Sequence, residues 1–396
     1  MAFGTTPYDK PLQEAWESFC DQLKEASALV FRDTMPATAV DRATGFQYLS
    51  RYITKAFADR LEYSDPLYPQ LWRMQSPVSK CFGDNPDCSY LTAYIDGAHT
   101  YRIVGNRGTS QWVSFCCHEA GYGPLVGALN EADIRTEWDG SFEVVLSPER
   151  QPGNWLKTAP GVHWLFIREY FGEWDRERPM TIRIERVGAE GAPPPLTPER
   201  MIRALQACGP WLIEDSRRWI DRYPENYSKG TPNQFFVRNQ AYSGGDGAEK
   251  ATGRMVNFCY WEVQPDEALI LEVTPPKCAF WNFELLNYYF ISMDYRYRLS
   301  SLNGRQAVFE DDGSVRAVLS HADPGVPNWL DASGHCNGMI NQRWVDSEDR
   351  PLARTRLVKF ADLASALPST TRRFSPAQRN EQLRRRKIGV DLRFPP

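Results

Sequence analysis

The chain has 396 residues, of which 42% are hydrophobic and 24% are charged, and its formal net charge is -4. This length exceeds what one hydrophobic core usually supports, so we expect two domains. The small negative charge gives no general attraction to nucleic acid or acidic membranes, and no apolar run approaches the length that crosses a bilayer.

Nine cysteines without a CxxC pair disfavour a disulfide framework and a structural zinc site. The N-terminus lacks a basic segment followed by an apolar core, so no signal peptide is expected. Together these features predict a cytoplasmic protein.

Two amphipathic helices are predicted at the N-terminus. From Pro11 to Val30, and again from Ala43 to Phe57, apolar residues recur every three or four positions. Asp41 lies near the start of the second helix, where the helix dipole favours an anion. We expect residues 1–62 to form a helical segment that caps a β-sandwich or mediates self-association, because its charges are scattered rather than convergent.

Short strands and turns follow, and residues 63–187 are predicted to form a first β-sandwich module. Within it, Ser89 to Gly108 has the pattern of a hairpin that turns at Asp96-Gly97. Residues 188–225 are predicted to form a linker and a helix. The linker is rich in Gly, Ala and Pro, and Thr197-Pro198 supplies an N-cap followed by proline at the first helical position.

Residues 226–396 are predicted to form a second β-sandwich module with a basic C-terminal tail. Strands are expected at Tyr260–Val263 and Ala268–Val273, followed by an aromatic run from Phe280 to Tyr297. The tail from Arg372 to Lys387 is locally basic, and a solvated surface helix or arm is favoured over a polyanion site.

Two stretches repeat one order of motifs. Asp139–Tyr170 reads DGSFEVVLSPERQPGNWLKTAPGVHWLFIREY, and Asp312–Trp344 reads DGSVRAVLSHADPGVPNWLDASGHCNGMINQRW. A long repeat in constant order indicates a duplicated module. We therefore predict a mainly β fold with flanking helices (α+β), built from two tandem jelly-roll-like β-sandwich modules related by internal duplication. In each copy the tryptophan of NWL is expected to lie in a loop and to plug the end of a sandwich.

Several segments also resemble a known family. The stretches KCFGDNPDCSYLTAYIDGAHTYRIVGNRG, GNWL, WNFELLNYYFISMDYRYR and DPGVPNWLDASGH are similar to the bacterial domain-of-unknown-function family numbered twelve-fourteen, in its longer form. The resemblance runs from about Ala15 onward. It implies a jelly-roll type β-sandwich, often paired with a related second domain, and it implies no catalytic residues.

Ionisable residues present in one copy of the repeat are the candidates for catalysis, because shared residues are first expected to specify the fold. The second copy has His321, Asp323, Asp331 and His335, where the first has Pro148, Arg150, Lys157 and a differently placed His163. Two histidines and two aspartates on neighbouring loops could supply a general base and a carboxylate that orients it. Two alternatives stay open: His321, Asp323 and His335 as ligands of a divalent metal, or Asp331 capping a turn beside a structural His335.

The candidates for substrate binding come from the aromatic run and the second repeat: Trp281, Glu284, Asp294, Arg296, Trp329 and Arg343. If part of the run is a strand, alternate residues face one side, which would put Asp294 and Arg296 together with aromatic rings, a layout suited to sugars or flat apolar ligands. A buried carboxylate beside rings would have a raised pKa and could act as an acid. The alternative is a sandwich core with ion pairs at its rim, and the shared Trp329 and Arg343 fit that alternative as well.

The function predicted from these residues is acid/base hydrolysis or elimination on a hydroxylated, glycosylated or aromatic small molecule. The alternative is a non-catalytic ligand-binding or assembly protein. No cofactor is expected, with a divalent metal as the less favoured alternative. The expected partner is a small molecule rather than nucleic acid or membrane, with self-association through the N-terminal helices. There is no GxSxG, P-loop or HExxH motif.

Overall fold

The computed structural model describes residues 4–119, 123–237 and 248–395. The first module contains β1 (Trp72–Gln75), β2 (Cys88–Tyr94), β3 (Tyr101–Asn106), β4 (Trp112–His118), β5 (Leu125–Asn130), β6 (Ser141–Ser147), β7 (Asn154–Lys157), β8 (Trp164–Tyr170) and β9 (Thr181–Arg186). These strands form a five-stranded sheet in the order β1-β2-β8-β4-β5 and a four-stranded sheet in the order β7-β6-β3-β9.

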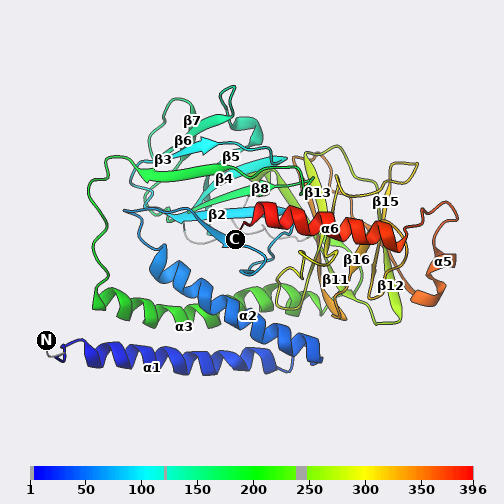
Figure 1. Ribbon diagram of the computed structural model, residues 1–396, viewed down its shortest axis with the longest axis horizontal. Helices are drawn as coiled ribbons and strands as arrows, with labels where there is room; N and C mark the ends of the chain where they lie inside the picture. The colour runs from blue at the N-terminus through cyan, green and yellow to red at the C-terminus, as the bar shows by residue number, and fades with distance from the viewer. Residues whose placement is uncertain (1–3, 120–122, 238–247, 396) are drawn as a thin grey trace.

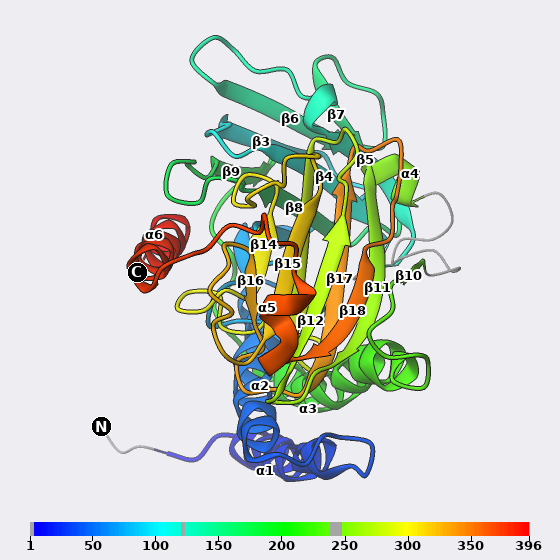
Figure 2. The ribbon, with the colours of Figure 1, turned by 90° about the vertical axis from the view of Figure 1, so that its right-hand side faces the viewer.

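The second module repeats this arrangement. Its strands are β10 (Phe236–Val237), β11 (Arg254–Glu262), β12 (Glu267–Val273), β13 (Phe280–Leu286), β14 (Ser301–Asn303), β15 (Val315–Ser320), β16 (Trp329–Asp331), β17 (Asn337–Val345) and β18 (Arg354–Lys359). The sheet orders are β10-β11-β17-β13-β14 and β16-β15-β12-β18. Each strand of the first module therefore has a counterpart nine strands later, and the predicted duplication of a β-sandwich is confirmed (Figures 1 and 2).

The repeated motifs make the same contacts in both modules. Asn154 accepts a hydrogen bond from the Arg135 backbone and donates to two carbonyl groups, and Asn328 does the same with Val308 as the counterpart of Arg135. The NWL segments were expected to be loops, but they form the short strands β7 and β16, which pair in parallel with β6 and β15. The conserved order of motifs thus encodes one hydrogen-bonding pattern twice.

The predicted hairpin at Asp96-Gly97 is wrong. β2 pairs with β1 and β8 in the five-stranded sheet, whereas β3 pairs with β6 and β9 in the four-stranded sheet. The turn therefore carries the chain from one sheet of the sandwich to the other. A turn sequence specifies that the chain reverses, but it does not specify which strand becomes the hydrogen-bonding partner.

Strand alternation divides the side chains of each five-stranded sheet between two environments. In β8, Leu165 and Ile167 belong to the core of the first sandwich, whereas Trp164 and Phe166 face outward. The outward faces of both five-stranded sheets share one apolar cluster with the helices. Tyr170 and Phe280, whose ring centroids are 4.9 Å apart, join the two modules in this cluster.

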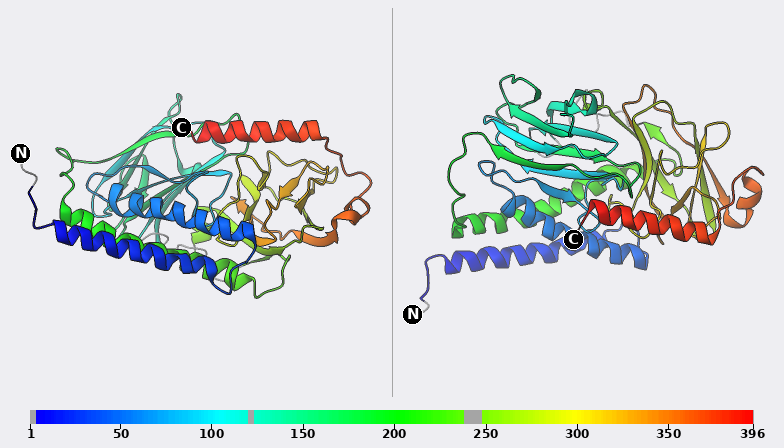
Figure 3. Two further views of the ribbon diagram at one scale, coloured as in Figure 1. Left: turned by 60° about the horizontal axis from the view of Figure 1, so that its bottom comes forward. Right: turned by 45° about the horizontal axis from the view of Figure 1, so that its top comes forward.

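Helices α2 (Ala39–Phe57) and α3 (Pro198–Ile220) cover these outward faces, and α1 (Asp9–Ala26) packs against α3. They lie on one side of both modules, with α1 beside α3 (Figures 1 and 3). The predicted cap of α3 is confirmed, since the Thr197 side chain accepts from the Arg200 backbone and Pro198 is the first helical residue. Two short helices, α4 (Ala248–Thr252) and α5 (Leu363–Ala366), lie in connections. None of the helices in the described ranges is long and apolar enough to span a membrane.

Large apolar side chains remain on the surface of α1 and near α2. Trp16, Phe31 and Phe46 are 53%, 58% and 46% exposed, and the rings of Phe31 and Phe46 are in contact. Self-association through the N-terminal helices therefore stays a prediction, and these side chains are the surface that would support it.

The C-terminal helix α6 (Pro376–Arg393) lies away from α1–α3 and crosses the seam between the two modules (Figures 1 and 3). The expectation of a solvated basic helix is wrong for one of its faces. Arg379, Arg386 and Arg393 are spaced seven residues apart, share one side of the helix and are buried. Arg386 and Arg393 both lie over the ring of Trp174, at 4.2 and 4.1 Å.

Residues 80–87, which we call the bridging loop, extend from the first module onto the second. Gly83 donates its backbone N–H to the Phe290 carbonyl, and the Arg343 guanidinium donates to the Gly83 carbonyl. Asp87 accepts hydrogen bonds from Asn282 and Asn303 of the second module. The polar part of the outward face of the second five-stranded sheet is therefore buried beneath this loop.

Candidate functional site

Each residue predicted to be catalytic is engaged by a different partner. A ring nitrogen of His321, Nε2, lies 3.0 Å from the Val263 carbonyl oxygen. Asp323 forms a two-point ion pair with Arg379 of α6, at 3.0 and 3.1 Å. These two side chains tie the β15–β16 connection to neighbouring elements, so the structure gives them local structural partners rather than a shared substrate position.

Asp331 and His335 also point to separate partners. One carboxylate oxygen of Asp331 lies 3.0 Å from Arg298, and the other accepts from the Ser333 backbone at 2.7 Å. This is the turn-capping alternative recognised in the sequence. His335 is buried, and its Nδ1 lies 2.6 Å from Oδ1 of Asp41 on α2. The structure thus brings His335 together with a carboxylate that was not among the predicted site residues.

The metal-binding alternative is not formed. Within the ranges that the structure describes, no group of three or more His, Cys, Asp and Glu side chains is arranged to hold a metal ion. His321, Asp323 and His335 are therefore not gathered into a ligand set.

The predicted substrate-binding residues of β13 and β17 are buried in two different places. Trp281 belongs to the apolar core of the second sandwich, because alternation turns it away from the outward face. Glu284 and Arg343 lie on that outward face, where they form an ion pair, and Asn341 donates to Glu284 at 2.7 Å. Burial raises the pKa of the Glu284 carboxyl, while Arg343 and Asn341 oppose the shift. The bridging loop covers this pair, so it has no open path to a ligand.

Asp294 and Arg296 were predicted to share one face of a strand, and this is wrong. β13 ends at Leu286, and the chain from there to β14 is a loop. Asp294 accepts from the Arg296 and Tyr297 backbone N–H groups, and the Arg296 side chain lies 3.4 Å from Asp391 of α6. The run of aromatic residues gave no signal for the end of the strand.

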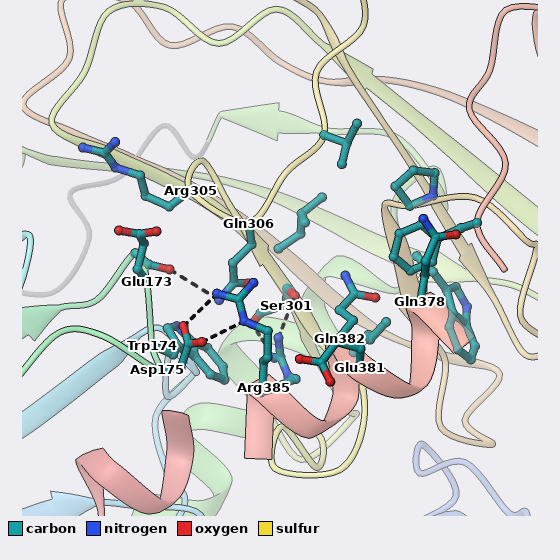
Figure 4. Close-up of a pocket in the computed structure, with 18 of the residues that line it drawn as sticks. Glu173, Trp174, Asp175, Ser301, Arg305, Gln306, Gln378, Glu381, Gln382 and Arg385 are labelled. Carbon is teal, nitrogen blue, oxygen red and sulfur yellow. Dashed lines mark hydrogen bonds and ion pairs between the residues drawn. The ribbon is translucent and has the colours of Figure 1, made fainter. Parts of the chain in front are cut away.

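Among the predicted site residues, Trp329 lines a large cavity. This cavity, which we call the α6 pocket, has a volume of about 600 Å³ and lies between α6, the β14–β15 region and the loop after β8 (Figure 4). Its apolar wall is formed by Trp174, Leu299, Leu302, Val308, Pro327, Trp329, Phe374 and Ala377. The volume is in the range of small-molecule sites, about 300–1,000 Å³.

Charged residues of the α6 pocket are largely paired with one another. Arg385 reaches Asp175 with two contacts of 2.7 and 3.2 Å, and this hydrogen bonding lowers the pKa of Asp175 (Figure 4). Arg386 donates to the Ser301 hydroxyl at 2.8 Å. Glu381 pairs with Arg384, and this hydrogen bonding lowers the pKa of the Glu381 carboxyl. The pocket therefore offers an apolar wall and polar side chains rather than a free acid.

The spacing of arginines near the C-terminus is a sequence feature that indicates which face of α6 is buried at this site. The basic tail has arginines at positions 379, 386 and 393, and this spacing of seven residues indicates one face of a helix. The basic run Arg372–Lys387, which holds two of these arginines, predicts a solvated helix or arm. The burial of the arginine face depends on Trp174, Asp87 and Asp323, which are distant in the sequence.

Comparison with known proteins places this architecture in a family. The family described as "Protein of unknown function (DUF1214)" matches residues 92–172 and 267–344, one stretch in each module. A solved structure of an uncharacterised protein from Burkholderia cenocepacia is 33% identical, covers 89% of this chain and 99% of that chain, and superposes with a TM-score of 0.82. The chain belongs to the DUF1214 family.

In this DUF1214 protein, the first match spans β3 to β8 in full and the second spans β12 to β17. The VPA0106 protein from Vibrio parahaemolyticus is 12% identical, with a TM-score of 0.44, and covers 79% of this chain and 98% of that chain. A search of curated proteins finds no match to the chain.

Proposed function

We propose that this DUF1214 protein binds a small molecule with an aromatic or alicyclic body in the α6 pocket. The observation that carries the proposal is a cavity of about 600 Å³ walled by Trp174, Trp329 and Phe374. Aromatic side chains in a concave site bury a flat ligand with little loss of side-chain entropy.

The polar lining supports a hydroxylated ligand. Gln306, Gln378 and Gln382 line the pocket, and their amides can both donate and accept hydrogen bonds. Glu381 and Asp175 are committed to Arg384 and Arg385, so a cationic ligand would have to break an existing pair. A neutral phenol or aryl glycoside fits this balance of an apolar wall and amide groups.

Trp329→Ala is expected to weaken binding of such a ligand by about 5- to 150-fold, because removing a stacked ring costs about 1–3 kcal/mol. The matched control is Trp155→Ala. Trp155 is the counterpart of Trp329 in the first module. The Trp155 indole donates to the Ser147 carbonyl at 3.2 Å, and the Trp329 indole donates to the Ser320 carbonyl at the same distance. Calorimetric titration with phenols and 4-nitrophenyl glycosides measures both variants. Absence of saturable binding, or equal losses in the two variants, would contradict the proposal.

A second candidate function is acid/base hydrolysis or elimination centred on His335. It is supported by the contact of 2.6 Å between His335 Nδ1 and Asp41, since a carboxylate on one ring nitrogen orients the other as a base. Asp41 is itself held by Thr38, which caps α2. Hydrolysis would transfer a proton from water to Nε2 of His335 and then to the leaving group.

His335→Gln is expected to lower the turnover of 4-nitrophenyl glycosides by about 100-fold or more if this second function is correct. Glutamine can still donate to Asp41, so the midpoint of thermal unfolding should change little. The matched control is His99→Gln, which alters an exposed His–Asp pair of the first module, with Asp96 at 3.9 Å. Turnover that is absent in the wild type, or unchanged in His335→Gln, rejects the enzymatic function.

A further inference from the structure

A second cavity lies on the outward face of the five-stranded sheet of the first module, across this sheet from the sandwich core. It has a volume of about 520 Å³ and is enclosed by α2, α3 and the outward face of the five-stranded sheet. Its apolar lining includes Met74, Phe82, Tyr94, Trp164 and Trp211. We call it the helix–sheet cavity, and it shares no lining residue with the α6 pocket.

Lys55 of α2 lines this cavity in an unusual environment. The side chain is 3% exposed, and its ammonium nitrogen lies 4.9 Å from the ring centroid of Trp72, 4.9 Å from that of Phe82 and 5.8 Å from that of Trp211. Within the described part of the chain, the ammonium group has no hydrogen-bond acceptor and no carboxylate within salt-bridge distance. Rings attract a cation but accept none of its N–H groups in strong hydrogen bonds.

Lys80 shows how this protein satisfies a buried ammonium group elsewhere. Lys80 is also 3% exposed and lies over the ring of Tyr295, but its nitrogen donates to the Ser292 and Met293 carbonyls at 2.9 and 2.5 Å. A buried charge without such acceptors is costly. Lys55 therefore lacks hydrogen-bond acceptors of the kind that Lys80 has. It faces a cavity that is large enough for a ligand to supply them.

The charge of the Asp215 carboxyl group, close to Lys55, affects whether an anion can bind in the cavity. Asp215 of α3 accepts from the Tyr52 hydroxyl at 3.3 Å, and burial raises the pKa of Asp215 to about 6, against the opposing charges of Lys55 and Arg218. The charged and titratable groups that face Asp215 or line the cavity are Lys55 of α2, Asp59 and Arg60 of the helical turn Ala58–Glu62 that follows it, Glu214 and Arg218 of α3, and Tyr94 and His163 of the first module. Because Asp215 is neutral below this pKa, its repulsion of an anion is lost there.

We propose that the helix–sheet cavity binds a small organic carboxylate, whose oxygens accept hydrogen bonds from Lys55 and whose apolar body packs against Trp164 and Trp211. A carboxylate supplies both the acceptors and the compensating charge that the ammonium group lacks. A cationic ligand would not supply the hydrogen-bond acceptors that the Lys55 ammonium group lacks. A neutral amide of the same shape would supply an acceptor without the charge, so it should bind more weakly.

Binding is coupled to protonation of Asp215. The bound carboxylate favours the neutral form of Asp215, so the complex takes up a proton where Asp215 is ionised in the free protein. Affinity should therefore be highest below the pKa of about 6 and should fall as the pH rises above it. Asp215→Asn removes this titration and should make the affinity nearly independent of pH.

The test uses benzoate and cyclohexanecarboxylate, with benzamide and cyclohexanecarboxamide as neutral isosteres, in calorimetric titrations of the full chain. We expect saturable binding of a carboxylate, at least tenfold tighter than its amide, and at least a tenfold loss in Lys55→Met, whose apolar stem keeps the packing against the rings. Wild-type affinity should fall on moving from about one unit below to two units above the pKa of Asp215. The Asp215→Asn comparison tests the site even if Lys55→Met fails to fold.

Trp329→Ala, in the α6 pocket, should leave carboxylate binding unchanged, which separates this inference from the proposed function. Equal affinity for acid and amide, an effect of Trp329→Ala as large as that of Lys55→Met, or a pH dependence that persists in Asp215→Asn would each overturn the proposal. Absence of carboxylate binding would also overturn it, since water alone would then solvate Lys55.

Discussion

Replacing Arg343 by methionine is expected to lower the free energy of unfolding by about 3–5 kcal/mol, because it strands a buried charge. Arg343 is 3% exposed and is paired with Glu284, which is fully buried. Its guanidinium also donates to the Gly83 carbonyl at 3.2 Å. Methionine fills much of the same volume, so most of the loss should come from the uncompensated Glu284 carboxyl and not from a cavity.

The duplication provides a matched control for this variant. Arg168 occupies the corresponding position in β8, is also 3% exposed, and contacts the Cys116 sulfur at 3.7 Å where Arg343 contacts Glu284. It lies 3.9 Å from the centroid of the Phe166 ring. Arg168→Met leaves no buried carboxylate behind, so a loss of about 1–2 kcal/mol is expected. Urea denaturation measures both variants, and equal losses would contradict the explanation.

Asp87→Ala is expected to be at least as severe, with a loss of about 3–5 kcal/mol. The Asp87 carboxylate accepts hydrogen bonds from Trp174 at 2.8 Å, Asn303 at 2.6 Å and Asn282 at 2.7 Å. It also faces the charges of Arg386 and Arg393, two buried arginines of α6. The substitution leaves three donors without their shared acceptor and removes the negative charge that faces two buried cations, so α6 should detach from the seam between the modules.

Limited proteolysis of the connection before α6, together with urea denaturation, tests this expectation. The control is Asp175→Asn, which removes the exposed ion pair between the loop after β8 and Arg385 of α6. An exposed pair contributes about 0–1 kcal/mol, so this variant should stay protected from cleavage. If Asp87→Ala is no more susceptible than Asp175→Asn, the carboxylate does not hold α6 in place.

The fold was predictable because its signals are local and occur twice. Each copy of DGS, VLS and NWL places turn residues and alternating apolar residues at the same spacing, and each produces strands in the same sheet positions. Thr197 and Pro198 likewise specify the start of α3 through contacts within one turn of helix. Such contacts need no knowledge of distant residues.

The predicted site was less accurate because convergence in space is not a local property. His321, Asp323 and Asp331 are close in sequence, yet they are engaged by Val263, Arg379 and Arg298. His335 finds its carboxylate on α2, almost three hundred residues earlier in the chain. Spacing within a loop indicates which groups are near one another, but their partners are chosen by packing between modules.

The sequence by itself determined the two modules, their duplication and the N-cap of α3, since these depend on neighbouring residues and on strand and helix periods. Tertiary structure decided which strands pair with β2 and β3, on either side of their turn. It also decided the burial of one face of α6 and the positions of the α6 pocket and the helix–sheet cavity. The physical reason is that an arginine or lysine side chain can be solvated or buried with equal local propensity. Arg386 is buried because Trp174, Ser301 and Asp87 surround it, and Lys55 because Trp72, Phe82 and Trp211 do.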